Sequence, residues 1–298
     1  MIGVICALYN EAVPIVKVLG LRPAARVVRG FRIFEGEDCV LGVSGAGAMN
    51  AAILTAILLE RYGDRIRCAA NFGSCGLTER GRKKMAIGDL VLCNGVYSSM
   101  HGAKAYHPEI LFNHPLQEAR LMTVDRPIDR DGDTDLSELL SDFDAVDMEA
   151  HGFMWAAELF LPPSRTHVFK IPSDHLEPSA VTGQGLMALV QGQVERFISL
   201  LSEIRRQCRK KDRNAQDGAS SRGGEGEILD DPRLSTSMRH RLNSLLAYAR
   251  LNDMAAREVL KWQKALLLEK PGKEGVKAAL RELEARLIRV PLRMESGQ

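Results

Sequence analysis

Short apolar runs and helix-like patterns alternate along the first two hundred residues, and this alternation restricts the fold more than any other feature. Strand-like runs occupy 2–8, 27–34, 39–43, 66–72, 89–96, 120–124, 145–148 and 166–171. Apolar residues at helical spacing occupy 10–19, 48–62, 149–161 and 185–208. Strands that alternate with helices predict an α/β domain. We expect a three-layer sandwich with a central twisted mixed sheet over residues 1–208, followed by a helical C-terminal tail.

The charge distribution separates this body from the tail. The whole chain carries 40 Lys and Arg against 38 Asp and Glu, a net charge of +2. Residues 1–204 hold 19 basic and 25 acidic residues, whereas residues 205–298 hold 21 and 13. Residues 209–235 are polar and rich in Gly and Ser, which predicts a flexible linker. Apolar spacing resumes over 236–298, which predicts a basic helical tail.

The tail's interleaved charges bear on its partners. Basic and acidic residues alternate around Lys273, Glu274 and Lys277, which is typical of a solvated helix surface. Aromatic platforms beyond Tyr248 and Trp262 are lacking. We therefore expect the tail to contact another protein or to pack on itself, and consider nucleic acid unlikely as its partner.

The cysteines and the N-terminal segment predict a cellular location. None of the six cysteines forms a CxxC pair, and most lie in apolar runs, as free thiols do in a reducing compartment. The first apolar stretch lacks a basic leader and soon reaches Glu11, so it does not resemble a signal peptide. No run approaches the ~18 apolar residues of a membrane span. These features predict a cytoplasmic protein without membrane association.

Two glycine-rich segments follow strand-like runs. Residues 42–50 read GVSGAGAMN between a strand and a helix, and residues 71–76 read NFGSCG at a strand end. Pure turn geometry would explain either one. Open α/β sheets bind ligands at such strand ends, however, and glycine lets the backbone approach a ligand closely. The first segment does not have the G-x-G-x-x-G spacing of dinucleotide sites.

Carboxylates occur at three further strand ends. Glu11 follows the first strand, the triplet Asp147-Met148-Glu149 opens a helix, and Asp174 follows the strand over 166–171. Each acid has an ordinary explanation as a residue that interacts with a helix N-terminus. The chain contains no His/Cys cluster with metal-ligand spacing, so we expect no metal.

In their order and approximate separations, these segments resemble the nucleoside phosphorylase/nucleosidase superfamily, and most closely the 5′-methylthioadenosine/S-adenosylhomocysteine nucleosidases and related bacterial nucleosidases. The strings that carry the resemblance are MIGVICALYNEA, VSGAGAMNAA, NFGSCGL followed by IGDLV, VDMEAHGF and IPSDH. The resemblance covers about residues 1–204 and leaves out the tail.

The resemblance implies a purine nucleosidase that releases the free base from a 5′-substituted adenosine, without any cofactor. Asp174 would be the general acid that protonates the purine at N7, oriented by Ser173. Glu149 would accept hydrogen bonds from the ribose hydroxyls, with Met148 on the sugar face, and Glu11 would activate the attacking water. Ser74 and Gly76, in the second glycine segment, would bind substrate near that water and the base. The family also implies a homodimer, bordered by the stretch over 100–116.

This chemistry fits the residue types independently of the resemblance. Cleavage of an N-glycosidic bond develops positive charge on the sugar and negative charge on the base. A carboxylic acid can protonate the base, and positioned acid–base groups contribute ~10²–10⁴-fold. Carboxylates near the sugar stabilise its positive charge.

Departures from the family pattern leave two alternatives open. Lys170 stands where the family commonly has Arg, and Pro172 stands where it commonly has a small residue. Phe72 fills a position that a smaller residue usually holds. Phosphorolysis by the same fold is one alternative, but the position where phosphorolytic relatives carry a phosphate-binding Arg is Asn71. A catalytically degenerate scaffold that presents the tail is the other. His151 and His175 flank two motifs and are minor candidates for substrate contact.

Overall fold

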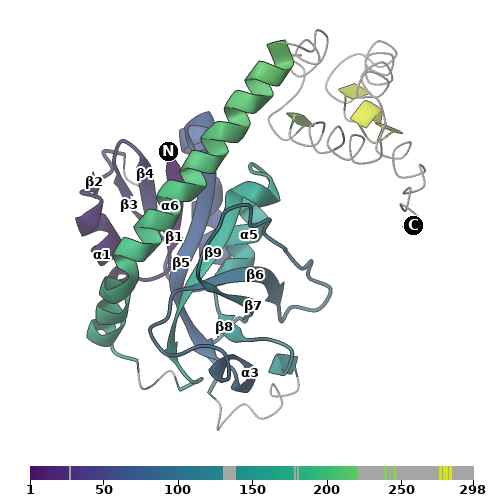
Figure 1. Cartoon of the computed structure of the whole chain (residues 1–298). Helices are drawn as coiled ribbons and strands as arrows, with labels where there is room; N and C mark the ends of the chain where they lie inside the picture. Colours follow the sequence, from purple (N-terminus) through teal and green to yellow (C-terminus); the bar gives the residue numbers. More distant parts are fainter. Residues whose placement is uncertain are drawn as a thin grey trace. The chain divides into compact units, whose positions relative to one another are not determined.

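A computed structural model describes residues 1–26, 28–129, 139–177, 179 and 181–220, together with isolated positions between 238 and 283. Side chains are described up to Arg209 and at those isolated positions. The chain divides into two compact units, Met1–Lys210 and Lys211–Gln298. The first unit contains every described strand (Figure 1).

Nine described strands form one mixed sheet. They are β1 (Ile2–Cys6), β2 (Arg22–Pro23), β3 (Arg32–Glu35), β4 (Cys39–Val43), β5 (Cys68–Leu77), β6 (Val91–Ser98), β7 (Gln117–Thr123), β8 (Ala145–Asp147) and β9 (Thr166–Asp174). Their order is β2-β3-β4-β1-β5-β8-β7-β6-β9. β9 also pairs with β5, so five of the strands, β5-β8-β7-β6-β9, close into a ring.

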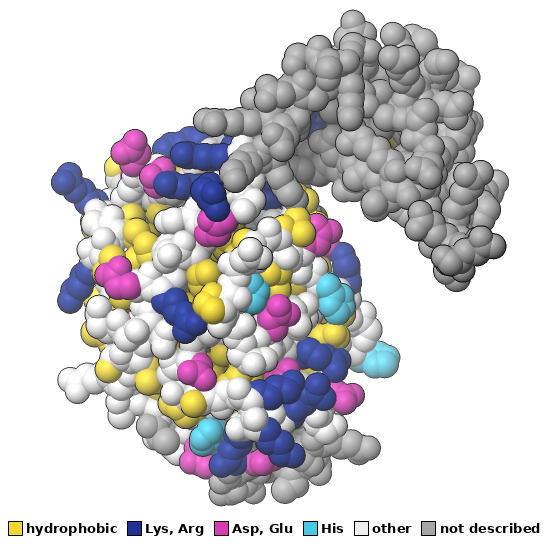
Figure 2. Space-filling view, in the orientation of Figure 1, with side chains coloured by type: hydrophobic (Ala, Val, Ile, Leu, Met, Phe, Trp, Pro, Cys, Tyr) yellow, Lys and Arg dark blue, Asp and Glu magenta, His cyan; other side chains and the backbone are white. Residues whose placement is uncertain are grey.

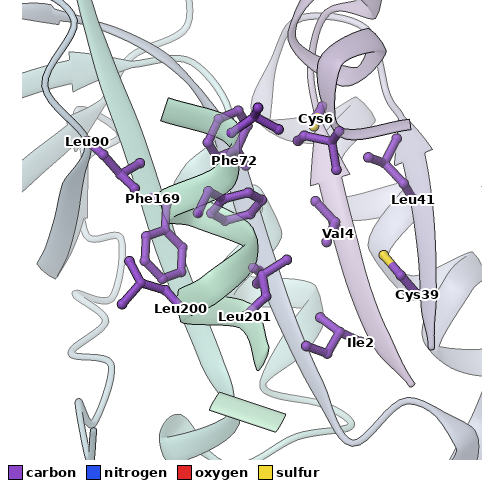
Figure 3. Close-up of a cluster of buried hydrophobic side chains, with 14 of the residues drawn as sticks. Ile2, Val4, Cys6, Cys39, Leu41, Phe72, Leu90, Phe169, Leu200 and Leu201 are labelled. Carbon is purple, nitrogen blue, oxygen red and sulfur yellow. The ribbon is translucent and has the colours of Figure 1, made fainter. Parts of the chain in front are cut away.

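Helices cover both faces of this sheet. The described ones are α1 (Tyr9–Val18), α2 (Ala48–Tyr62), α3 (Glu79–Arg82), α5 (Ala150–Ala157) and α6 (Gly183–Ser220). On one face α1 and α6 pack against the sheet around Phe72, Phe169 and Phe197, as Figures 1 and 3 show in part. On the other face α2 and α5 contribute Leu58 and Phe153 to a second core. The expected α/β fold with a central mixed sheet is therefore confirmed.

β5 differs from the expected pattern. We expected the strand to end at Phe72 and residues 71–76 to form a turn, but β5 continues to Leu77. The reason is pairing, because β9 runs parallel to it from Ala69 to Gly76 and β8 pairs with its last two residues. The glycines of this segment therefore lie within a strand and not in a turn.

α6 extends further than the sequence indicated. It runs from Gly183 to Ser220 and so passes through the beginning of the segment that we expected to be a linker from 209. Its buried stripe includes Val190, Val194, Phe197 and Ile204. Beyond Cys208 the sequence is polar but consists largely of Arg, Lys, Gln and Ala, which favour helix.

The rest of the predicted linker, and most of the predicted tail over 236–298, lie outside the described residues. None of the described helices combines the length and apolar character that crossing a membrane requires.

Candidate active site

The seven residues that the sequence predicted for the site line one cavity of about 250 Å³. They come from the α1 N-terminus, from β5 and β9, and from the turn after β8: Glu11, Ser74, Gly76, Met148, Glu149, Ser173 and Asp174. The structure therefore brings together residues from distant parts of the sequence. Apolar residues that the sequence analysis missed complete the wall, among them Val124, Ile128, Leu176 and Val181. Their segments carry no motif, so no local signal identifies them.

Glu11 is buried and its carboxylate accepts four hydrogen bonds. Oε2 accepts from the backbone N–H groups of Ala7 (3.1 Å) and Leu8 (2.9 Å). Oε1 accepts from the backbone N–H and the hydroxyl of Ser74, both at 2.8 Å. The N-cap of α1 is Leu8, so the helix starts one residue before the expected position 10, and Glu11 supplies the capping carboxylate. Glu11 therefore interacts with a helix N-terminus, as its ordinary explanation states, and also lines the cavity.

Glycines on β5 make room for these carboxylates. A Cβ atom at Gly73 would lie 3.1 Å from both carboxylate oxygens of Glu11. A Cβ atom at Gly76 would lie 3.2 Å from Oδ1 of Asp174 and 2.8 Å from Cδ2 of Leu176. Contacts this short are not tolerated by a real side chain without displacement, so the strand needs glycine where the acids approach it.

Asp147, which lines the cavity, forms a buried ion pair with Lys170. Nζ of Lys170 lies 2.7 Å from Oδ2 of Asp147, and both side chains are almost fully buried. The same Oδ2 accepts from the backbone N–H of Ala150 at 2.8 Å, and Oδ1 accepts from the Thr123 hydroxyl at 2.6 Å. The carboxylates of Asp147 and Glu149 raise the pKa of Lys170 against the opposing effect of burial, so the lysine is charged. Asp147 thus caps α5 and anchors the turn that carries Glu149.

Glu149 is buried at the start of α5 and lines the cavity. Its Oε1 accepts a 2.8 Å hydrogen bond from the backbone N–H of Gly47, in the first glycine segment. Burial, followed by the nearby Asp147 carboxylate, raises the pKa of Glu149 to about 7, while Lys170 acts in the opposite direction. The first glycine segment therefore serves to hold this carboxylate, and Ala46 lines the cavity beside it.

A pH profile follows from the raised pKa of Glu149. Glu149 is a full hydrogen-bond acceptor in the cavity only when it is ionised, so we expect kcat/KM for a reaction at this site to rise as the pH increases through about 7. The measurement is kcat/KM between weakly acidic and weakly alkaline pH for the wild type and Glu149→Gln. The residual activity of Glu149→Gln should lack this rise. A rise near 7 that persists in the variant would assign it to another group.

Asp174, the candidate acid, is half-buried at the mouth of the cavity. The hydroxyl of Ser173 donates to its Oδ2 at 2.7 Å, and the backbone N–H of Glu177 donates to its Oδ1 at 3.0 Å. These contacts fix the carboxyl group toward the cavity, where it can reach a ligand. The carboxyl group is therefore partly open to solvent.

The two minor histidine candidates lie elsewhere. The Nε2 atom of His151 is 2.9 Å from the carbonyl oxygen of Lys104, and the side chain is buried outside the cavity. His175 lines a neighbouring cavity. Within the described parts of the chain, no group of three or more His, Cys, Asp or Glu side chains is arranged to hold a metal ion.

Comparison with known proteins agrees with the resemblance. Residues 1–120 match the family model of the phosphorylase superfamily. Comparison with curated proteins gave no match. The family model therefore confirms the resemblance to this superfamily over residues 1–120, and the solved structures described below share the fold.

Three solved structures illustrate the shared fold. A Helicobacter pylori MTAN mutant with 5′-methylthioadenosine in its active site has a TM-score of 0.57 at 17% identity, covering 68% of this chain and 98% of that one. A futalosine hydrolase mutant of the same organism gives 0.58 at 16% identity, with coverages of 68% and 98%. Arabidopsis thaliana 5′-methylthioadenosine nucleosidase gives 0.54 at 19% identity, with 68% and 95%. At these identities the likeness concerns the fold.

Proposed function

We propose that this protein hydrolyses the N-glycosidic bond of a purine nucleoside, of the 5′-substituted adenosine type, and releases the free base. The observation that carries the proposal is the convergence of Glu11, Glu149 and Asp174 on one cavity, with Ser74 and Ser173 bonded to two of these acids. A degenerate scaffold has no use for three such carboxylates at one ligand-sized site.

In this reaction each acid has a separate task. Asp174, held by Ser173, delivers a proton to N7 of the departing base, which neutralises the negative charge that develops there. Glu149 accepts hydrogen bonds from the ribose hydroxyls and, with Glu11, stabilises the positive charge on the sugar. Glu11 also orients the attacking water and takes its proton. Met148 lies against the sugar.

The charge of the cavity favours water over phosphate as the nucleophile. A phosphate ion needs cations where water has been excluded, and no Lys or Arg is among the described residues that line this cavity. Asn71 is buried inside the sheet, where its amide donates to the carbonyl of Ile5, so it does not reach a ligand. Lys84 pairs with Asp144, and Lys83 lines the neighbouring cavity.

The experiment that tests the proposal is product analysis. The purified protein is incubated with a panel of 5′-substituted adenosines, with and without phosphate, and products are identified by mass. We expect free adenine and free sugar at a rate independent of phosphate. Formation of a sugar 1-phosphate, with turnover that stops when phosphate is removed, would establish phosphorolysis instead. Intact nucleosides throughout would contradict the proposed function.

We also propose a homodimer, as the resemblance implies. An apolar surface is exposed on the outer side of α2 and α5. Met49, at the start of α2, is 77% exposed, and Ile53 lies four residues after it. Trp155 of α5 is 59% exposed, and Leu159 lies four residues after it. The two helices touch, because a Cβ atom at Gly152 of α5 would collide with the backbone of Ala48 of α2. Exposed apolar surfaces of this kind mark protein interfaces.

Replacing Trp155 with glutamate is expected to convert the dimer to a monomer, because it places a charge at the centre of the apolar surface. The measurement is molar mass by light scattering after size-exclusion chromatography. Trp155→Phe, which keeps an aromatic ring, should remain dimeric. A monomeric wild-type protein would contradict the proposal.

The role of the predicted tail, as a segment that contacts another protein, stays a prediction.

A further inference from the structure

A second cavity of about 400 Å³ adjoins the candidate active site and has no part in the reaction proposed above. Ile128 and Leu176 line both cavities, so the two cavities meet at these side chains. Leu77 and Leu140 add further apolar surface, and Lys83 lies on its rim. The second cavity is therefore placed to take one part of a ligand whose remainder occupies the active site.

The position of Asp174 indicates the direction in which a substituent on the purine would extend, and this step rests on the proposed function. In a purine, N7 and the exocyclic group at the 6-position lie on the same edge of the ring system. If Asp174 protonates N7, the 6-position lies further along that edge, on the side away from the sugar. His175 and Leu176 follow Asp174 directly in the chain, and both line the second cavity. A substituent at the 6-position would therefore extend toward this cavity.

The backbone is strained at Leu176, where the two cavities meet. Leu176 has a φ of +61°, a left-handed conformation that branched side chains seldom adopt, and no other non-glycine residue among those described has a positive φ. Strained residues of this kind concentrate at ligand sites, where the surrounding structure holds them in place. The strain places the Leu176 side chain over Gly76, at the boundary of the two cavities.

The charges around the second cavity favour an anionic end group. Glu79 pairs with Arg82, while Arg80 and Lys84 share the carboxylate of Asp144. Lys83 lines the cavity, is exposed and has no ion-pair partner among the described residues. Figure 2 shows Lys and Arg side chains gathered on the lower part of this face, where Figure 1 places α3. His175 adds a buried Nδ1 atom that has no hydrogen-bond partner within the described structure.

We propose that the second cavity binds a substituent at the 6-position of the purine, one that is apolar next to the ring and ends in a carboxylate. The substrate class would then be adenosines substituted at N6. The apolar part of the substituent packs against the side chains of Leu77, Leu140, Ile128 and Leu176. The carboxylate binds Lys83.

Binding of free bases tests this inference separately from catalysis. Titration calorimetry compares adenine with N6-(carboxypropyl)adenine on the wild-type protein, and we expect the extended base to bind at least about tenfold more tightly. Lys83→Glu should lower the affinity for the extended base about tenfold more than that for adenine, because it replaces a charge-assisted contact with repulsion. Lys17→Glu, on α1 and outside both cavities, is the matched control and should leave the ratio of the two affinities unchanged.

Leu140→Phe provides a second test by volume. Leu140 lines the second cavity and does not line the first, so a larger side chain there should weaken binding of the extended base more than that of adenine. A thermal unfolding curve checks that each variant is folded.

Three results would overturn the inference: an extended base that binds more weakly than adenine, binding of neither base, or an affinity ratio that Lys83→Glu leaves unchanged. Tight, Lys83-dependent binding of the extended base without cleavage of any nucleoside would support the inference and contradict the proposed function.

Discussion

Asp174→Asn is expected to lower kcat by ~10²-fold or more while the protein stays folded. The amide has nearly the same shape, and its oxygen can still accept from the backbone N–H of Glu177, while its NH2 group can only donate to the Ser173 hydroxyl. It has no carboxylic proton to deliver to N7. A positioned general acid contributes ~10²–10⁴-fold, so its loss should exceed any effect of a slightly altered contact. The measurement is kcat for release of adenine at saturating substrate.

Two controls make this result specific to Asp174. Asp64→Asn changes an exposed acid in the short helix Gly63–Arg65, outside the cavity, and should leave kcat unaltered. Ser173→Ala removes the hydroxyl that orients Asp174 and should cause a smaller loss than Asp174→Asn. Wild-type kcat in folded Asp174→Asn would remove this residue from the mechanism.

Lys170→Met is expected to lower the free energy of unfolding by about 3–5 kcal/mol, because it leaves the buried Asp147 carboxylate without its partner. The side-chain volume is nearly kept, so a cavity contributes little. The measurement is urea denaturation at neutral pH. The same change should raise the pKa of Glu149 further, since the lysine acts to lower it, and should displace the rise of kcat/KM to higher pH.

A double-mutant cycle separates the ion pair from general damage to the core. Asp147→Asn in the Lys170→Met background removes the uncompensated charge, so the double variant should be more stable than the sum of the two single losses predicts. Strictly additive losses would show that the pair has no special role. Lys170→Arg tests the departure from the family pattern. The planar guanidinium does not reproduce the single 2.7 Å contact, so we expect this substitution to be destabilising as well.

The sequence predicted the candidate site better than it predicted the way the site is held. Glu11, Glu149 and Asp174 stand at strand ends or helix starts, where the local pattern alone allowed an ordinary explanation for each. The resemblance to a known family, carried by short motifs in order along the chain, singled them out, and the structure places all three at one cavity. The partners that fix these acids were not accessible in this way. In the sequence Lys170 is only a departure from a motif, because its pairing with Asp147 depends on how β8 and β9 are placed in the strand ring.

Two features of the backbone escaped prediction for different physical reasons. Residues 71–76 contain two glycines and therefore indicated a turn, but glycine is needed there because Glu11 and Leu176 press against a continuous strand. The α6 extension escaped because the polar, Gly- and Ser-rich composition of 209–235 as a whole predicted a linker, although seven of the twelve residues over 209–220 are Arg, Lys, Gln or Ala, which favour helix. In both cases a compositional signal competed with a packing or propensity effect.

The closed strand ring has a consequence for the behaviour of the protein at high concentration. Every strand of the ring has a hydrogen-bonded neighbour on both sides, and among the described strands only β2 has a single neighbour. β2 consists of Arg22 and Pro23, both exposed. Proline has no N–H to donate and arginine opposes the approach of other basic edges, so this border is a poor template for an additional strand. The sheet should therefore resist edge-to-edge aggregation at high protein concentration.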